Sequence, residues 1–451
     1  MRDFLPEDIR RREYVIGVIR RVYESYGFEP LETPAVENLE TLLGKYGDEG
    51  NQLIFKILKR GEHEATGQAD LALRYDLTVP LARVVAQYQS KLPRLFKRYQ
   101  IQPVWRADRP ARGRFREFYQ CDVDALGSTS PVIEAEQCAA VSEALSELGF
   151  QDFVIRINHR AVLTGLLSGF GIPEELHGGA LVALDKLDRV GPEGVESELT
   201  TRGVSQDATD NLLNYFEFAK NTGANTVRVA GDWQRANETF LGVGLERVPL
   251  SGPFHDAAAN LREIVALAGT TSAAQRIRVD FSLARGLSYY TGAIMEINVP
   301  DMAGSLGGGG RYDDLVGMFL GQRVPACGFS LGLERILVVM GERRMFPPNL
   351  PSAAADVMMA VFDAADMPHA LRVASLLRRS GLRVLMYPEA DKIGKQIKYA
   401  DSLGIPFVAI LGGNEIAAGT ITVKDLAAQT QMTYGQAAAG GAILEGLKHR
   451  G

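Results

Sequence analysis

Apolar residues near the start of the chain recur at the spacing of a helix face. Successive positions are separated by seven, three and four residues, which places them along one side of a helix. They are Ile9, Ile16, Ile19 and Tyr23. Pro6 suits the first helical turn, and Gly27 supplies a stop signal. The pattern predicts an amphipathic helix between Pro6 and Gly27.

Shorter patterned runs follow this helix. Short β-type runs predict strands at Leu71–Tyr75 and Phe115–Val123. The segment Val79–Gln87 between them has helical spacing. An Ala- and Glu-rich amphipathic helix is predicted over residues 131–148, and residues 160–270 are mostly helical with interrupting glycines.

Strand character returns in the second half of the chain. Ile277–Leu283, Gly292–Val299 and Ala326–Ser330 are predicted strands, with a glycine-dense turn between the last two. We therefore predict an α+β body over residues 1–345, with a large antiparallel sheet flanked by helices and a helical insertion at about 165–270.

The pattern changes near residue 345. Residues 346–355 are rich in proline and alanine and predict a linker. Beyond them strands and helices alternate, which predicts a small α/β domain over residues 356–451. The alternating elements are Val357–Phe362, Pro368–Ser380, Arg383–Tyr387, Ile393–Leu403 and Phe407–Leu411.

Composition narrows the class of protein. A chain of 451 residues with 46% hydrophobic and 23% charged residues is typical of a folded protein of two or three domains. The 49 basic and 55 acidic side chains exclude bulk positive charge as a means of binding nucleic acid, but not a local basic patch. No apolar run has the length of a membrane span, and the first residues do not resemble a signal peptide. Three widely spaced cysteines fit free thiols, so we expect a cytoplasmic protein.

The segment from Arg94 to Asp124 concentrates positive charge. Asp108 is the only acid among its basic residues before Glu117, and aromatic residues are interleaved with them. The basic residues are Arg94, Lys97, Arg98, Arg106, Arg109, Arg112, Arg114 and Arg116. Such a segment is an anion-binding patch or, equally well, a solvated basic hairpin with core aromatics on its inner face.

Two glycine-bracketed segments are further candidates. Residues 285–292 place an arginine directly before a glycine, and two tyrosines and a threonine before a second glycine, where they could reach a small polar ligand. The run Gly307–Gly310 and the later segment 328–336 could bring backbone and Arg335 close to a phosphate. Both patterns also occur in plain structural turns.

Other chemistries find little support. The six histidines are scattered without an HExxH or Cys/His cluster, so a protein-bound metal is not expected. No GxSxG motif is present, and Cys121 has no nearby histidine. The remaining candidates are arginines, carboxylates and glycines, which suit transfer at phosphorus.

Five segments, in order, resemble the histidyl-tRNA synthetases, which are class II aminoacyl-tRNA synthetases. Residues 104–108 and 114–118 resemble the second class II motif, and Gly332–Arg335 resembles the third. Residues 285–292 match the signature specific to the histidine enzymes except at Ser288. The other two matching segments are residues 73–80 with 118–122, and residues 395–401 of the last domain.

The resemblance implies a histidine--tRNA ligase. Such an enzyme forms histidyl-adenylate from L-histidine and ATP with Mg²⁺, and then transfers histidine to the 3′ end of tRNA(His). It implies the class II catalytic fold in residues 1–345, an anticodon-binding domain in residues 356–451, a homodimer and a cytoplasmic location. An alternative is a synthetase-like regulatory subunit of histidine biosynthesis, but such relatives typically lose the C-terminal domain. A generic RNA-binding protein is a third reading, which does not explain the carboxylates.

Site residues follow from the resemblance position by position. The catalytic residues would be Arg106 and Arg285. The histidine-binding residues would be Asp76, Leu77, Thr78, Arg106, Gln120, Asp124, Arg285, Tyr289 and Tyr290. The ATP-binding residues would be Arg106, Asp108, Arg114, Phe118 and Arg335. The tRNA-binding residues would be Arg109, Arg112, Lys395 and Lys398, and no residue would bind a structural metal.

Two positions depart from the family pattern. Asp108 is one methylene shorter than the usual glutamate, and Ser288 replaces an acid beside the tyrosines. The chain also begins directly at the Arg2-Asp3-Phe4 element, which suggests that a short N-terminal segment is absent.

Overall fold

The computed structural model describes residues 1–61, 66–230, 233–246, 253–284, 289–348, 350 and 353–449. The chain divides into two compact units. One consists of Met1–Phe4 and Arg12–Met345, and the other of Leu5–Arg11 and Phe346–Gly451. Helix α1 (Pro6–Ser25) follows the predicted helix closely. Among the described residues, no helix combines the length and apolar character needed to cross a bilayer.

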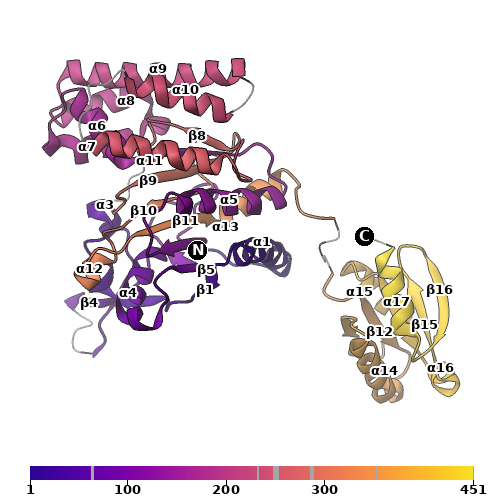
Figure 1. The fold of residues 1–451 in the computed structure, drawn as a ribbon. Helices are drawn as coiled ribbons and strands as arrows, with labels where there is room; N and C mark the ends of the chain where they lie inside the picture. Colours follow the sequence, from indigo (N-terminus) through magenta and orange to yellow (C-terminus); the bar gives the residue numbers. More distant parts are fainter. Residues whose placement is uncertain are drawn as a thin grey trace. The chain divides into compact units, whose positions relative to one another are not determined.

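The first unit is built on an eight-stranded sheet of order β1-β5-β6-β11-β10-β9-β7-β8 (Figure 1). Its inner pairs are antiparallel, and only the outer pairs β1/β5 and β7/β8 are parallel. This confirms the predicted antiparallel body. The strands are β1 (Glu29–Pro30), β5 (Phe96–Trp105), β6 (Glu117–Leu126), β7 (Val154–His159), β8 (Ile277–Val279), β9 (Ala293–Asn298), β10 (Gly307–Arg311) and β11 (Ala326–Gly332).

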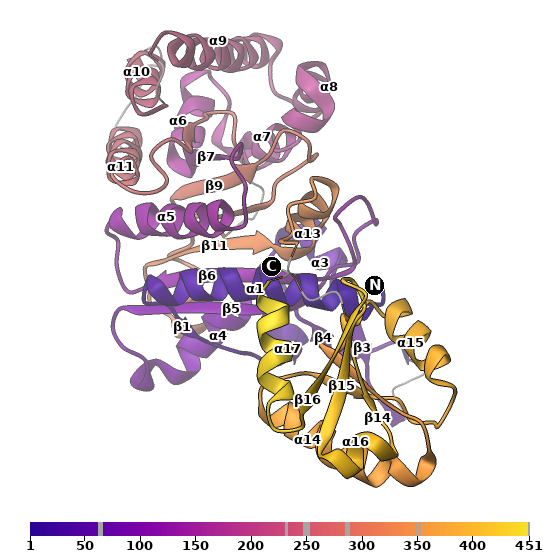
Figure 2. The same cartoon turned by 90° about the vertical axis from the view of Figure 1, so that its right-hand side faces the viewer.

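Helices cover one face of this sheet. Helix α1 lies along β5 and β6 (Figure 2), where the Tyr23 ring is 6.4 Å from that of Tyr99. Helix α5 (Val132–Glu147) covers the middle strands, and Gln137 Nε2 donates a hydrogen bond to the Cys327 carbonyl at 2.7 Å. Because side chains alternate along a strand, the odd-numbered residues of β6 face these helices and the even-numbered ones face the other side.

A smaller sheet and helix supply that other side. Strands β2 (Val36–Asn38), β4 (Ala69–Leu73) and β3 (Lys56–Leu58) pair in that order, and α4 (Thr78–Tyr88) follows β4. Buried Arg74 fixes the connection: it donates hydrogen bonds to the carbonyls of Pro103 at 2.8 Å and Thr33 at 2.6 Å. The first residues of α4 are thereby held against β5 and β6. Two short helices complete this region, α2 (Leu39–Leu42) and α3 (Gly47–Gln52).

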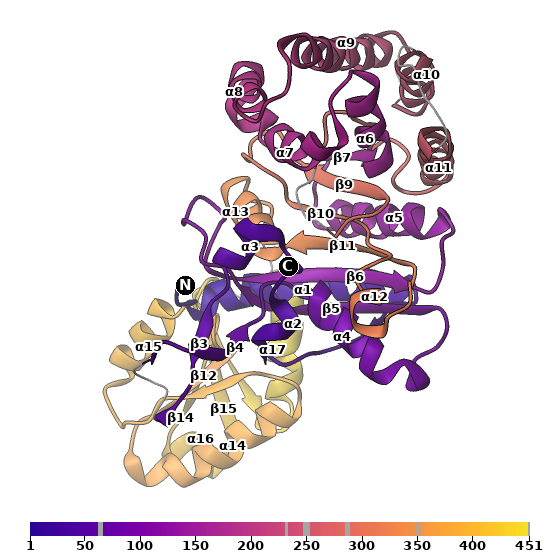
Figure 3. The ribbon, with the colours of Figure 1, turned by 90° about the vertical axis from the view of Figure 1, so that its left-hand side faces the viewer.

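The chain between β7 and β8 is helical, as its pattern predicted. These helices gather beside β7 and β8, at one edge of the sheet (Figure 3). Tyr215, Phe240 and Phe281 form an aromatic stack in their core, with Phe240 and Phe281 centroids 4.8 Å apart. The helices are α6 (Arg160–Gly169), α7 (Glu174–Leu184), α8 (Leu187–Thr201), α9 (Gln206–Ala230), α10 (Trp233–Glu246) and α11 (Pro253–Ala268).

Two local predictions were wrong. The glycine run is not a turn: Gly307–Arg311 forms the buried strand β10, paired on both sides. A Cβ on Gly310 would lie 2.9 Å from the Tyr290 ring, so glycine lets that ring approach the sheet. The strand expected at Ile277–Leu283 ends at Val279, because the Asp280 side chain accepts the Ser282 N–H at 3.0 Å and turns the chain.

The second unit has a five-stranded mixed sheet of order β13-β12-β14-β15-β16. The alternation predicted its first three strands and the helices α14 and α15, while the antiparallel pair β15/β16 and the helices α16 and α17 lie beyond the predicted pattern. Separate apolar clusters cover the two faces of the sheet. The elements are β12 (Val357–Val361), α14 (Met367–Arg379), β13 (Val384–Met386), α15 (Ile393–Ser402), β14 (Phe407–Leu411), α16 (Gly413–Ala418), β15 (Thr420–Asp425), β16 (Thr430–Gly435) and α17 (Ala439–Lys448).

Candidate active site

Asp76 is held at the start of α4 by three separate segments. Its Oδ1 accepts the Val79 N–H and the Tyr46 hydroxyl, both at 3.0 Å, and its Oδ2 accepts the Tyr289 hydroxyl at 3.3 Å. Burial raises the pKa of Asp76, although these bonds and the charge of Arg106 oppose the rise. The result is a fixed carboxylate inside the protein.

Leu77 and Thr78 continue this corner. The Leu77 side chain is fully buried in the core, and its backbone carbonyl accepts a hydrogen bond from Arg98 Nη2 at 3.2 Å. The Thr78 side chain is half-buried and hydrogen-bonds with Tyr289. Of the two, only Thr78 presents a polar side chain toward the tyrosines.

The even-numbered face of β6 carries a row of polar residues next to this corner. Gln120 donates a hydrogen bond to Ser330 Oγ on β11 at 3.0 Å. Asp124 forms an ion pair with Arg98 on β5 at 2.8 Å and accepts a hydrogen bond from the Tyr312 hydroxyl. Burial raises the pKa of Asp124, and Arg98 is the largest influence that lowers it. Gly328 lies opposite Asp124 in the register, and a Cβ there would collide with the carboxylate.

Three tyrosines close the site around these acids. The rings of Tyr289 and Tyr290 meet edge to face at 5.1 Å, and those of Tyr289 and Tyr312 at 6.0 Å. Burial and the charge of Asp76 raise the pKa of Tyr289 well above its usual value. Its phenol therefore stays protonated at neutral pH and remains a hydrogen-bond donor.

Sequence reasoning missed four residues of this site: Tyr46, Arg98, Asp122 and Tyr312. Arg98 was counted as part of a basic patch, but its side chain is fully buried and neutralises Asp124. Lys97 likewise pairs with Glu136 at 2.7 Å. The segment 94–116 is therefore not one anion-binding surface. Alternation along the strand could have separated Arg98 from it, but Tyr46 carries no sequence signal.

Arg106 lies where the buried site meets the surface. Its guanidinium stacks on the rings of Tyr75 at 4.3 Å and Phe118 at 5.2 Å, and its Nε donates to the Tyr75 carbonyl at 3.0 Å. These contacts fix the plane of the guanidinium, so its position is set before a ligand arrives.

The loop between β5 and β6 is more exposed. Arg109, Arg112 and Arg114 are exposed and Asp108 is half-buried. Arg112 is engaged by Glu342 and by the Asp301 carbonyl at 2.8 Å. Gly113, in the left-handed region at φ +68°, brings the loop against Arg335: a Cβ there would lie 3.0 Å from its Cγ. The structure thus brings this loop and the first turn of α13 (Leu333–Glu342) together.

Arg285 and Ser288 fall within residues 285–288, which lie outside the described residues. The described chain before them is tied to β7, because Asn158 Nδ2 donates to the carbonyls of Phe281 at 3.2 Å and Leu283 at 3.0 Å. The described chain after them begins with Tyr289, which contacts Asp76.

Comparison with known proteins identifies the relatives of this chain. The family profile described as "Histidyl-tRNA synthetase" matches residues 1–336. The chain belongs to the histidyl-tRNA synthetase family. A second profile, "Anticodon binding domain", matches residues 356–444.

Individual relatives agree with the histidyl-tRNA synthetase assignment. The chain is 41% identical to a histidine--tRNA ligase of Cytophaga hutchinsonii and 39% identical to that of Christiangramia forsetii, with 94% of each chain covered in both comparisons. The crystal structure of histidyl-tRNA synthetase from Nostoc superposes with a TM-score of 0.76 at 32% identity, covering 98% of this chain and 97% of that one.

The region that matches the family's anticodon-binding domain carries the other two candidate residues. Lys395 and Lys398 are exposed on α15. Lys395 pairs with Asp391 at 2.6 Å, and Asp391 also accepts the Tyr387 hydroxyl at 2.8 Å. The Tyr387 ring meets that of Tyr399 at 5.5 Å, and Tyr399 is 45% exposed. Cationic and aromatic side chains thus share this surface.

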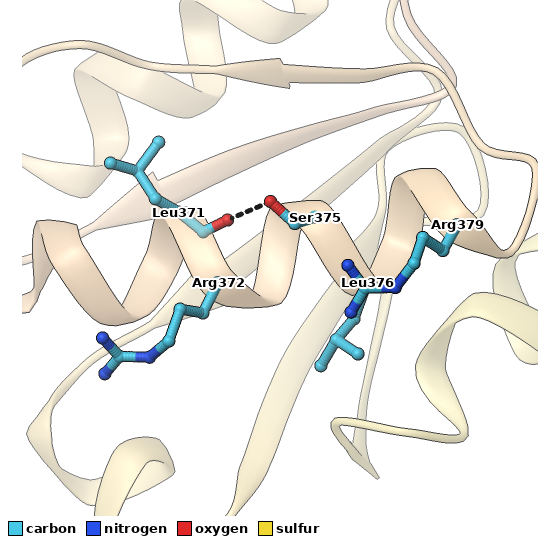
Figure 4. A pocket seen from close by; sticks show the side chains of 5 residues that line it. All are labelled: Leu371, Arg372, Ser375, Leu376 and Arg379. Carbon is cyan, nitrogen blue, oxygen red and sulfur yellow. Dashed lines mark hydrogen bonds between the residues drawn. The ribbon is translucent and has the colours of Figure 1, made fainter.

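Three further features could carry chemistry: metal ligands, cysteines and a surface pocket. Among the residues described, no group of three or more potential ligands is arranged to hold a metal. The three cysteines are buried and free, and burial raises the pKa of each thiol, so none is an activated nucleophile. A pocket on α14 is lined by side chains of that one helix (Figure 4). They are Leu371, Arg372, Ser375, Leu376 and Arg379.

Proposed function

We propose that this protein is a histidine--tRNA ligase. In the first step, a carboxylate oxygen of L-histidine attacks the α-phosphorus of ATP, and pyrophosphate leaves. In the second, the terminal ribose hydroxyl of tRNA(His) attacks the histidyl carbonyl, and AMP leaves. The observation that carries this function is the buried polar corner around Asp76 and Asp124, on a chain whose relatives are named histidine--tRNA ligases over 94% of its length.

The α-ammonium group of histidine would bind at Asp76. The two oxygens of this carboxylate are fixed by Val79, Tyr46 and Tyr289. Thr78 and Gln120 would accept the remaining N–H groups, and Leu77 would set the backbone between Asp76 and Thr78. A buried carboxylate with neutral acceptors beside it matches a cation with several N–H donors.

The imidazole would bind between Asp124 and the tyrosine pair Tyr289–Tyr290. Arg98 and Tyr312 hold the Asp124 carboxylate in place. A site that must pair with both ring nitrogens rejects apolar amino acids, because its own buried polar groups would then be left without partners. This end of the pocket would set the choice of amino acid.

The phosphates would bind at the exposed end. Arg106, held on Tyr75 and Phe118, would contact the substrate carboxylate and the α-phosphate. From the resemblance, Arg285 would reach the same phosphate from another direction. Arg114 would contact the terminal phosphates, and Mg²⁺ would enter with ATP as part of the substrate, near Asp108.

The adenine would bind between Phe118 and Arg335. Phe118 lies on β6, and Arg335 lies in the first turn of α13. The Arg335 guanidinium donates a hydrogen bond to the Ser305 carbonyl. An aromatic ring and a guanidinium plane on opposite sides would hold a flat base by stacking.

The tRNA would contact both units. Arg109 and Arg112 on the β5–β6 loop would meet the acceptor end, and Lys395 and Lys398 on α15 would meet the anticodon region. Residues 1–345 would form the catalytic domain with its helical insertion, residues 346–355 the linker, and residues 356–451 the anticodon-binding domain. We propose a homodimer in the cytoplasm. The anticodon-domain match favours this ligase over a regulatory subunit.

Amino-acid-dependent ATP–pyrophosphate exchange on the purified full chain tests the first step, and charging of a tRNA transcript tests the second. Among amino acids, only L-histidine should support exchange. Among tRNAs, only tRNA(His) should accept histidine. A folded protein that binds histidine but neither exchanges pyrophosphate nor charges tRNA would instead be a regulatory subunit.

A further inference from the structure

Asp122 lies in the middle of the polar row on β6, between Gln120 and Asp124. It is 2% exposed and lies opposite Gln100 on β5 and Ser330 on β11 in the strand register. Among the described residues, nothing hydrogen-bonds to Asp122 Oδ1 or to Gln120 Oε1. Two neighbouring buried acceptors therefore lack donors on the face that leads to the amino-acid site. Such groups are costly to bury, so their presence points to a ligand that supplies N–H groups.

Among the described residues, Asp122 forms no ion pair of its own, because the nearest arginine is engaged by Asp124. Asp76, Asp122 and Asp124 are all buried. Arg98 is the largest opposing charge at both Asp122 and Asp124, and it makes its close ion pair with Asp124. The charge of Asp124 disfavours ionisation of Asp122 across this strand face.

The groups whose charge or hydrogen bond acts on Asp122 come from several elements on both faces of the sheet. Ser330 on β11 hydrogen-bonds to its carboxyl, Asp76 before α4 adds a further negative charge, and Tyr23 on α1 and Arg74 after β4 interact with its charge. Burial is the largest cause of the raised pKa of Asp122, followed by the opposing effect of Arg98. The full set is Tyr23, Arg74, Asp76, Arg98, Gln100, Cys121, Asp124 and Ser330.

We propose that Asp122 is a further histidine-positioning residue, which holds a proton before the amino acid binds and releases it when the cationic amino acid binds. This proposal rests on the proposed function. The step is a simple proton transfer: the Asp122 carboxyl group gives up one proton to solvent, and the positive charge of the α-ammonium group replaces it beside the carboxylates. Histidine affinity must then rise with pH as Asp122 titrates, because binding favours the ionised form.

Proton counting by titration calorimetry tests the proposal directly. L-Histidine is titrated into the full-length protein at neutral pH in two buffers of different ionisation enthalpy. The wild type should release about half a proton to one proton more than Asp122→Asn, since the variant cannot carry the linked proton. The titration of histidine itself is common to both proteins and cancels in the difference. Equal proton counts would overturn the proposal.

A matched control separates this role from a general effect of removing a carboxylate. Glu37 is also buried, but it lies on β2 and Arg83 engages both its oxygens at 2.9 and 2.7 Å. Glu37→Gln should release the same number of protons as the wild type. The ratio of wild-type to Asp122→Asn affinity should grow with pH, by about tenfold for each unit by which bound histidine lowers the Asp122 pKa. A ratio independent of pH would leave Asp122 as a structural residue.

If Asp122→Asn does not fold, the proton count of the wild type alone still tests the proposal. Its proton count between acid and neutral pH should exceed what free histidine contributes, and a count explained by free histidine overturns the proposal. Failure of the proposed function looks different, because the wild type would then show no heat of histidine binding at all.

Discussion

The two ends of the site differ in how they are built. At the proposed amino-acid end, Asp76 and Asp124 are buried and already hold partners such as Tyr289 and Arg98. At the proposed phosphate end, the β5–β6 loop presents exposed arginines, and Arg112 is held at the surface by Glu342 and by the Asp301 carbonyl. The buried end is preorganised and suited to selecting a small ligand. The exposed end is suited to a larger, more variable anionic partner.

The largest effect is expected at Arg285. Arg285→Ala should slow adenylate formation by roughly 10²–10³-fold, the scale of removing one preorganised donor to a developing negative charge. Arg285→Lys should recover little, because a point charge cannot hold two phosphate oxygens as a guanidinium fork does. Single-turnover measurement of adenylation, and of transfer from preformed histidyl-adenylate, separates the two steps. Near-normal adenylation in folded Arg285→Ala would leave this arginine as a turn residue.

Removal of the second unit should separate the two reactions. A chain that ends at Pro348 should keep pyrophosphate exchange and lose most tRNA charging, because residues beyond it form their own sheet with its own core. Exchange and charging are measured on the same preparation, with folding checked by circular dichroism. If a folded truncated chain loses exchange, the modular account is wrong.

Asp124→Ala should affect histidine and spare ATP. Loss of one charge-assisted hydrogen bond costs about 1.5–3 kcal/mol, which is roughly a 10- to 150-fold rise in the KM for histidine. Tyr312→Phe removes only a hydroxyl that donates to Asp124, so it should raise this KM less. Steady-state exchange at varied histidine and varied ATP gives both constants. An unchanged KM for histidine would mean that Asp124 serves only as the ion-pair partner of Arg98.

The smallest effect on stability is expected at the exposed end. Arg112 and Glu342 are about half exposed, so solvent screens their ion pair and Arg112→Ala should leave the free energy of unfolding nearly unchanged. It should nevertheless weaken tRNA charging, whereas Glu342→Gln should not, because that change frees the arginine. Chemical denaturation and charging assays test both statements. Equal losses of charging in the two variants would show that the ion pair itself positions the loop.

Part of this architecture could be predicted because local pattern decides it. The helix at Pro6–Ser25 and the strand at Phe407–Leu411 follow from residue spacing, and the antiparallel body follows from its strand runs. The strand β10 could not be predicted, because four consecutive glycines favour a turn unless neighbouring strands pair with them.

The residues of the site could likewise be predicted only in part. The resemblance supplied Asp76 and Asp124, but their partners depend on strand register and tertiary packing. Arg98 faces Asp124 only because β5 and β6 pair in one register, and a shift by one residue would turn it to the other face. Tyr46 reaches Asp76 from 30 residues away in the sequence, which no local pattern reveals.

The central claim is that the site has a selective buried end and a separate exposed end, proposed to bind phosphate. Measuring the Michaelis constants for histidine and for ATP in two variants tests this claim most directly. Asp124→Ala and Arg114→Ala are compared with the wild type in pyrophosphate exchange at varied histidine and varied ATP. The account predicts that Asp124→Ala raises the KM for histidine and leaves that for ATP unchanged, while Arg114→Ala does the reverse. If each variant raised both constants by the same factor, the two ends would not be separate, and the account would be contradicted.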